Sequence, residues 1–137
     1  MDINGTTTAR IGPGLLVFLA VERGDTQGDV EYMAEKVVNL RVFPDEERRM
    51  NRSLKEVGGE LLVVSQFTLA GDCRKGRRPS FDRAEEPRKA EKLYDAFLEA
   101  CKKRGVPTAA GTFRAMMDVS LTNTGPVTLL LSTRKEF

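Results

Sequence analysis

Residues 60–69 read Glu-Leu-Leu-Val-Val-Ser-Gln-Phe-Thr-Leu, and this stretch decides the fold because it contains an uninterrupted apolar run. A Gly-Gly pair immediately before it predicts a turn, so the run is expected to be a buried strand. The strand ends in polar residues, Ser65 and Gln66, which are followed by Phe67 and Thr68. The sequence therefore predicts hydroxyl groups, an amide and backbone N–H groups together at the end of a strand.

The chain contains no histidine, which limits what Thr68 can do. A serine or threonine nucleophile normally needs an imidazole or an equivalent base to take its proton. Backbone N–H groups at the strand end could instead form an oxyanion hole for an acyl ester. The alternative is that the hydroxyls only end the strand by bonding to their own backbone. Both interpretations stay open from the segment Ser65–Leu69 alone.

Composition and length predict a single domain over residues 1–137, since 40% of the residues are hydrophobic and 31% are charged. The apolar run at 15–21 is too short to cross a bilayer, so no membrane segment is expected. The amino end lacks the pattern of a secretory signal, and two scattered cysteines, Cys73 and Cys101, favour a reduced cytoplasmic setting. Without histidine, and with no carboxylate spacing typical of a calcium loop, we expect neither a metal site nor a cofactor.

The spacing of apolar residues and the turn signals between them predict the other helices and strands. In chain order we expect a hairpin turn at Asn4-Gly5, a central strand at 15–21, a helix capped by Asp25 or Thr26 and ending near Leu40, a short strand at 50–54, the strand at 60–67, a helix at 85–103 followed by Gly105, and strands at 108–113, 117–121 and 127–131. Because several strands are joined by tight turns, the sheet should be mixed. The predicted class is α/β: one curled, barrel-like sheet packed with two main helices.

Two further segments carry candidate binding residues. The loop from Arg74 to Arg83 has five basic residues and one acid, although the net charge of the chain is only +2. Arg74, Lys75, Arg77 and Arg78 suit phosphate contacts, and Phe81 could stack on a base or anchor the loop; the alternative is a solvated charged loop. The second segment is Asn123-Thr124-Gly125-Pro126-Val127-Thr128, which predicts a turn whose Gly-Pro bond is either trans or cis.

Together, these segments resemble the bacterial and eukaryotic D-aminoacyl-tRNA deacylases, formerly called D-tyrosyl-tRNA deacylases. The matching stretches are residues 11–17, 37–43, 58–69, 72–81 and 123–128, which extend over nearly the whole chain. Ser65-Gln66-Phe67-Thr68 and Gly125-Pro126 correspond to the two signature motifs of that family. Phe113, Ala115 and Met117 match its Phe-Gly-Ala-x-Met pocket segment.

The resemblance implies a homodimer that hydrolyses the ester between a D-amino acid and the terminal adenosine of tRNA, as chiral proofreading in translation. The active site would lie at the dimer interface, where Ser65, Gln66, Phe67 and Thr68 line the pocket. A cis Gly125-Pro126 bond of the partner would contact the α-amino group of a D-substrate and clash with an L side chain. Glycine would be only weakly excluded, which extends the implied substrates to mischarged glycyl-tRNA.

The resemblance also implies a mechanism without a side-chain base. Thr68 has been regarded as the nucleophile in this family, and the later view is that the 2′-hydroxyl of the tRNA assists the attack. Backbone N–H groups of Phe67 and Thr68 would then stabilise the oxyanion. A site that works by placement and electrostatics needs no histidine. Which group drives the attack, Thr68 or the 2′-hydroxyl, is left open by the sequence.

Two departures from the family pattern affect this interpretation. Family members carry an earlier strand, about a dozen residues long with a Gln-Arg-Val segment, and without it we expect an exposed sheet edge. Arg114 stands where the family has Gly, beside the pocket, where it could crowd the site or recruit a phosphate. The alternatives to a deacylase are a non-catalytic nucleic-acid-binding module, which in this family usually has a basic extension beyond the position of Phe137, and an N-terminally truncated inactive member.

Overall fold

A three-stranded parallel sheet forms the centre of the protein in a computed structural model, which describes residues 1–3, 6–7 and 9–137. Its strands are β3 (Gly14–Leu19), β6 (Glu60–Ser65) and β7 (Thr108–Ala110), in the order β3-β6-β7. The middle position of β6 explains its sequence, because a parallel strand covered on both faces reads as a continuous apolar run. The strand predicted at 15–21 is shorter than expected, and it lies at an edge of this sheet and not at its centre.

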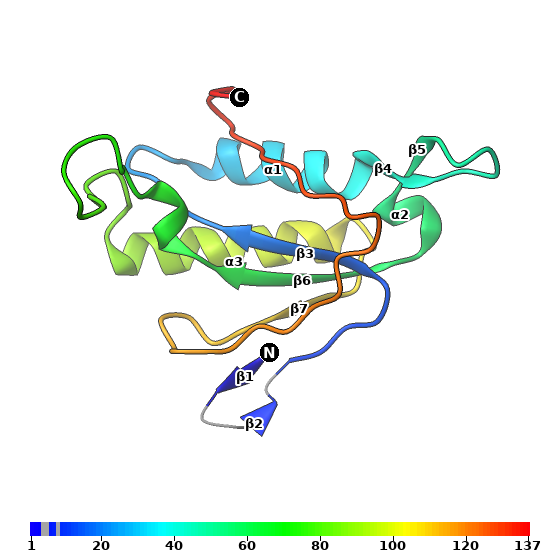
Figure 1. The fold of residues 1–137 in the computed structure, drawn as a ribbon, viewed down its shortest axis with the longest axis horizontal. Coiled ribbons are helices and arrows are strands. Elements are labelled where there is room, and N and C mark those ends of the chain that lie inside the picture. Colours follow the sequence, from blue (N-terminus) through cyan, green and yellow to red (C-terminus); the bar gives the residue numbers. More distant parts are fainter. Residues whose placement is uncertain (4–5, 8) are drawn as a thin grey trace.

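Two long helices cover one face of the sheet (Figure 1). Helix α1 (Gln27–Asn39) begins after Thr26, whose N–H donates to the Asp29 carboxylate at 2.8 Å, so Thr26 and not Asp25 is the N-cap. Helix α3 (Pro87–Lys103) begins with a proline, which loses no hydrogen bond at that position. Gly105 follows its end with a φ of 85°, as the sequence predicts for a helix terminus.

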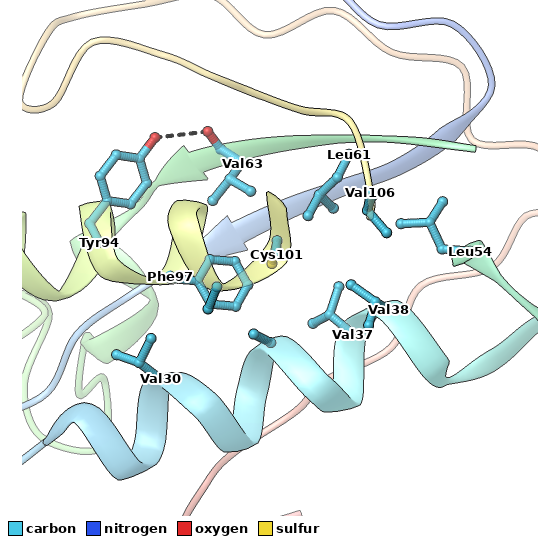
Figure 2. Close-up of a cluster of buried hydrophobic side chains, with 12 residues drawn as sticks. Val30, Val37, Val38, Leu54, Leu61, Val63, Tyr94, Phe97, Cys101 and Val106 are labelled. Atoms are coloured by element: carbon cyan, nitrogen blue, oxygen red, sulfur yellow. Dashed lines mark hydrogen bonds between the residues drawn. The ribbon is translucent and has the colours of Figure 1, made fainter. Parts of the chain in front are cut away.

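The main core lies between these helices and β6, as Figure 2 shows. Leu61 and Val63 of β6 point toward Phe97 and Cys101 of α3 and the valines of α1. Leu62 and Val64 point to the opposite face, where they pack with Met1 and with partly buried side chains that include Met117. This alternation follows from the two-residue period of a strand.

Smaller elements lie outside the central sheet. Strand β1 (Asp2–Ile3) pairs antiparallel with β2 (Thr6–Thr7), and β4 (Arg41–Pro44) pairs antiparallel with β5 (Met50–Ser53). The turn predicted at Asn4-Gly5 lies outside the described residues. Helix α2 (Leu54–Val57) follows β5 at once, so the strand predicted at 50–54 loses its last residue to a helix. Parallel and antiparallel ladders are thus both present, but in separate sheets, and the described strands form no closed barrel.

The last third of the predicted sheet is absent from the described part of the chain. The strand expected at 108–113 ends at Ala110, and neither 117–121 nor 127–131 is a regular strand. Among the described residues of 117–121, only Asp118 exchanges backbone hydrogen bonds, with Asp2 at 2.7 and 2.8 Å. Alternating side chains favour a strand but do not supply the neighbouring strand that it needs. No described helix combines the length and the apolar character that crossing a bilayer requires.

Candidate functional site at the carboxyl edge of the sheet

The three parallel strands end at one edge, and the candidate residues gather outside it. Strand β6 ends at Ser65, the neighbouring β3 ends at Leu19, and β7 ends at Ala110. Ligand sites of open α/β sheets lie beyond the carboxyl ends of such strands. In Figure 1 the short helix after β6, the loop that follows it and the turn after β7 lie at this end of the sheet.

The segment after β6 turns sharply into the 3₁₀ helix η1 (Phe67–Ala70). The N–H of Gln66 donates to the Leu19 carbonyl at 2.7 Å, which holds the start of this turn against β3. The N–H groups of Phe67 and Thr68, the first two of η1, have no hydrogen-bond partner within the described residues, as expected at a helix start. Both residues are exposed, and two adjacent N–H groups without a partner are the kind of donors that bind an anionic oxygen.

The Thr68 hydroxyl is held by an amide and not by a base. The side-chain amide of Gln66 donates to Thr68 Oγ1. An amide can orient a hydroxyl but cannot take its proton at neutral pH. The local geometry therefore offers a positioned hydroxyl and two peptide donors, and it contains no group of the kind that activates a serine or threonine nucleophile.

Phe81 anchors the loop that follows η1. Its ring packs edge-on against Phe67, with ring centroids 5.1 Å apart and an interplanar angle of 68°. Gly71 allows this approach, because a Cβ there would lie 3.1 Å from the Phe81 ring and 2.9 Å from the Thr68 carbonyl oxygen. Phe67 nevertheless remains 58% exposed. Of the two roles that the sequence left open for Phe81, the contact supports anchoring.

The basic loop contains two kinds of cation. Arg74 binds the Asp72 carboxylate with both Nε and a terminal nitrogen, at 2.9 and 2.7 Å, and this interaction lowers the pKa of Asp72 to about 2. By contrast, Lys75, Arg77 and Arg78 are exposed, and none of them forms an ion pair within the described residues. Of the four predicted phosphate ligands, these three have their charges free for another molecule.

The base of this loop is tied to distant segments. Arg83 pairs with Glu22 at 2.9 Å and with Glu136 at 2.8 Å. Arg134 pairs with the same Glu22 at 3.3 Å and with Asp25 at 3.3 Å. This network, and the Asp72–Arg74 pair, were missed from the sequence. The Asp-x-Arg spacing at the start of the loop is a signal for the second, whereas no local pattern indicates the first.

The residues predicted to line the pocket are not all brought together. Phe113 packs against Tyr94 on the helix-covered face of the sheet, with ring centroids 5.8 Å apart. Met117 packs on the opposite face, against the cluster that contains Leu62. Ala115 lies between them in a turn, where its N–H donates to the Thr112 carbonyl at 3.2 Å. Only this turn lies directly beyond the end of β7.

The Gly125-Pro126 bond is cis. Its turn is held by Asn123, whose side chain accepts from the Val127 N–H at 3.1 Å and donates to the Thr128 hydroxyl at 2.8 Å. Residues 121–126 are exposed, and no hydrogen bond or ion pair of the described residues joins this turn to Ser65–Leu69. Two hollows among the described residues also lie elsewhere, beside the β4–β5 turn and between α1 and the carboxyl-terminal segment. Within the described part of the chain, no hydrogen bond or ion pair joins the two motifs.

The fold and the site define an α/β protein whose candidate site offers peptide N–H groups and a hydroxyl in place of a histidine-based relay. The chain belongs to the D-Tyr-tRNA(Tyr) deacylase family, whose model matches residues 1–132.

The relatives agree with this assignment. The chain is 58% identical over its full length to a D-aminoacyl-tRNA deacylase of Syntrophobacter fumaroxidans, covering 92% of that protein. It is 54% identical over 98% of its length to a D-aminoacyl-tRNA deacylase of Thermodesulfovibrio yellowstonii, again covering 92% of the relative. A solved structure described as a c-Myc DNA Unwinding Element Binding Protein is similar with a TM-score of 0.90 and 39% identity, over 96% of this chain and 90% of that one.

Proposed function

We propose that this protein hydrolyses the ester that joins a D-amino acid to the terminal adenosine of tRNA, releasing free tRNA and the D-amino acid. It thereby acts as a proofreading hydrolase of translation, working in the cytoplasm. The observation that carries the proposal is the pair of unbonded N–H groups of Phe67 and Thr68 at the carboxyl edge of the sheet. Membership of the deacylase family over residues 1–132 supports it.

The two N–H groups act on the charge that develops during hydrolysis. Attack on the ester carbonyl carbon places a negative charge on its oxygen, and preorganised peptide donors stabilise that charge. Water is the attacking molecule, and the 2′-hydroxyl of the terminal ribose assists it. The water oxygen bonds to the carbonyl carbon, the bond from that carbon to the 3′-oxygen breaks, and the 3′-oxygen leaves with the proton that the water gives up. Thr68 orients the ester and does not become acylated, since its hydroxyl contacts the Gln66 amide and not a side chain that could take its proton.

Substitution of Thr68 distinguishes a residue that orients the ester from a residue that acts as the nucleophile. We expect Thr68→Ala to retain most of the activity, measured as the release of D-tyrosine from D-tyrosyl-tRNA, with L-tyrosyl-tRNA as the control substrate. A loss of more than about a thousandfold in rate, roughly 4 kcal/mol of barrier, would instead make Thr68 the nucleophile.

A matched pair at Phe67 tests the peptide donors. Phe67→Pro removes the N–H at the first residue of η1, where a proline ring fits, whereas Phe67→Ala removes the same aromatic ring and keeps the N–H. We expect the proline variant to lose about 100- to 1000-fold more in kcat than the alanine variant. Equal losses in two folded variants, checked by circular dichroism, would contradict the oxyanion role.

Chiral selection requires a second copy of the chain in this proposal. Gly125-Pro126 is exposed and is not joined to Ser65–Leu69 within one chain, and the segment that follows exposes Leu129 and Leu130. We propose a homodimer in which the Gly125-Pro126 turn of the partner enters the site and excludes L side chains. Glycine, which has no side chain to exclude, is then a weak substrate as glycyl-tRNA. Of the three residues predicted to line the pocket, Ala115 borders the site from the turn beyond β7, whereas Phe113 and Met117 support that turn from the two faces of the sheet.

Association can be tested at Leu130, which is 68% exposed. We expect Leu130→Asp to shift the protein from dimer to monomer in analytical ultracentrifugation and to reduce D-tyrosyl-tRNA hydrolysis in parallel. Thr124→Ser, in the neighbouring turn, keeps a hydroxyl at its position and serves as the control. A monomeric Leu130→Asp variant with full activity and full D-selectivity would exclude a site built by two copies.

A second candidate is a nucleic-acid-binding module without catalysis. The solved relative at 39% identity is described as a c-Myc DNA Unwinding Element Binding Protein, which favours this function, as do the exposed charges of Lys75, Arg77 and Arg78. Under the deacylase proposal the same three residues, with Arg74 holding the loop, bind tRNA phosphates. D-selective hydrolysis by the unmodified protein supports the first function. Nucleic-acid binding without any D-selective hydrolysis would support the second.

A further inference from the structure

Arg114 has a backbone conformation that residues with a side chain rarely adopt. Its φ is 65°, in the left-handed region that favours glycine. The conformation is set by the tight turn from Thr112 to Ala115, which follows β7. Phe113, the preceding residue, is packed against Tyr94 and the main core. The Arg114 backbone is thus held by its neighbours in a disfavoured state.

The turn holds Arg114 at the carboxyl edge of the sheet. Val63 pairs with Ala110 in the β6–β7 ladder, and the Gly111 N–H extends this contact to the Val63 carbonyl at 3.4 Å. The turn after β7 therefore starts beside Val63 of β6. Val63 is only two residues before Ser65, where the candidate site begins. From 111 to 119 half-buried and exposed residues alternate, and Arg114 is among the exposed ones. Its side chain accordingly extends from a fixed backbone into solvent.

The charge of Arg114 is isolated on its side of the site. It is the only Lys or Arg between Arg104 and Arg134 in the sequence. Arg104 and Arg134 both form ion pairs, whereas Arg114 has neither an ion pair nor a side-chain hydrogen bond within the described residues. In Figure 1 the basic loop and the turn after β7 extend from two separated places at the same end of the sheet. Among the described residues, Arg114 therefore supplies an unpaired positive charge at the turn after β7.

We propose that Arg114 binds a phosphodiester group of the RNA substrate close to the terminal nucleoside, across the site from the basic loop. This inference rests on the proposed function and names a binding residue for it. A guanidinium matches two phosphate oxygens with paired N–H donors, and because the backbone of the turn is already fixed, little backbone freedom is lost on binding. The basic loop and Arg114 together then hold the end of the RNA from two sides, with the ester between them.

Two substrates separate phosphate binding from every other role of Arg114. D-tyrosyl-tRNA carries the phosphates, whereas D-tyrosyl-adenosine has the same ester and no phosphate. We expect Arg114→Gln to raise KM for the tRNA substrate about tenfold, the scale of one charged hydrogen-bonded contact, with kcat unchanged. Hydrolysis of D-tyrosyl-adenosine should not change. Arg114→Lys, which keeps the charge but lacks the paired N–H donors, should recover only part of the loss.

Binding of uncharged tRNA gives a readout that does not depend on hydrolysis. We expect Arg114→Gln to weaken this binding about tenfold and to reduce the slope of log affinity against log salt by about one phosphate contact. Arg48→Gln is the matched control, because Arg48 is an exposed arginine with a φ of 64° in the β4–β5 turn, away from the carboxyl edge. It should leave KM, tRNA affinity and salt slope unchanged.

Several outcomes would overturn the proposal. An equal effect of Arg114→Gln on both esters would assign Arg114 to the shape of the pocket, and an unchanged salt slope would exclude a phosphate contact. If Arg48→Gln weakened tRNA binding as much as Arg114→Gln, both effects would result from the lower net charge and not from a specific contact. If the unmodified protein hydrolyses neither D-ester while Arg114→Gln still weakens tRNA binding, the phosphate contact stands and the deacylase function fails.

Discussion

Residues 14–110 and residues 111–137 are built in different ways. All twelve buried members of the main core come from the first region, which also contains the parallel sheet and both long helices. The second region has no buried residue and no regular helix or strand among its described residues. It is held by ion pairs such as Arg134–Asp25 and by the backbone contact of Asp118 with Asp2.

The presence of buried residues in only one region shows that the two regions are stabilised in different ways. Burial of apolar side chains drives the folding of the first region, whereas the second keeps Leu129 and Leu130 in contact with water. Exposed apolar residues gathered in one short segment are typical of a surface that another molecule covers. Residues 14–110 therefore form the carboxyl edge with their own buried core, whereas residues 111–137 leave an apolar segment exposed.

The largest difference in the free energy of unfolding is expected between two alanine substitutions, one in each region. Phe97 is 1% exposed in the main core, so Phe97→Ala should reduce the free energy of unfolding by about 3–5 kcal/mol. Leu130→Ala in the second region should change the same quantity by less than about 0.5 kcal/mol at concentrations where the chain is monomeric. Urea denaturation followed by circular dichroism measures both. Comparable losses would show that residues 127–131 are packed as firmly as the core.

A smaller change in the free energy of unfolding is expected from glycine substitutions at two residues whose backbone is left-handed. Arg48 lies in the first region and Arg114 in the second, and their φ angles are 64° and 65°. Replacing either with glycine should raise the free energy of unfolding by about 1 kcal/mol, because the steric cost disappears and glycine loses part of this gain as entropy. We expect both gains, since Phe113 ties the second turn to the core. A gain at Arg48→Gly without one at Arg114→Gly would show that residues 111–137 unfold separately.

The smallest effect concerns the exposed pair Asp72–Arg74. The folded pKa of Asp72, about 2, lies below its ordinary value of 3.8, so the pairing is complete above pH 3.8 and is lost as the pH falls through 2. Carboxyl ¹³C shifts should give a midpoint near 2 for Asp72, moving toward 3.8 in Arg74→Ala. The unfolding free energy should hardly respond, because solvent screens this pair. A midpoint that Arg74→Ala leaves unchanged would contradict the pairing.

The sequence predicted the elements that bury one face and missed those that depend on distant partners. The helical spacing of Val30, Val37 and Phe97 and the apolar run of β6 each record burial in the local sequence, and α1, α3 and β6 were found from them. The pattern at 117–121 is also strand-like, but a strand forms only against a neighbour, which no local pattern specifies. Helix α2 was missed because its four residues are too few to show a period.

The same limit applies to the site. Ser65–Thr68 and the basic loop are consecutive in the chain, so their common position beyond β6 could be predicted. The left-handed backbone of Arg114 could not, because it results from the packing of Phe113 and the turn after β7. The contact of Gly125-Pro126 with the site of a second copy stays a prediction.

The bridge between Asp72 and Ser80 has a consequence for the entropy of RNA binding. Two backbone hydrogen bonds of 2.7 and 2.9 Å join Asp72 to Ser80 and so enclose residues 73–79, which include the four predicted phosphate ligands of the basic loop, before any ligand arrives. A loop with joined ends has already lost much of its conformational freedom, so less is lost when its cations contact phosphates. Replacing Ser80 with proline would delete one of these bonds, and calorimetry should then record weaker tRNA binding through a less favourable entropy, with the number of charges on the loop unchanged.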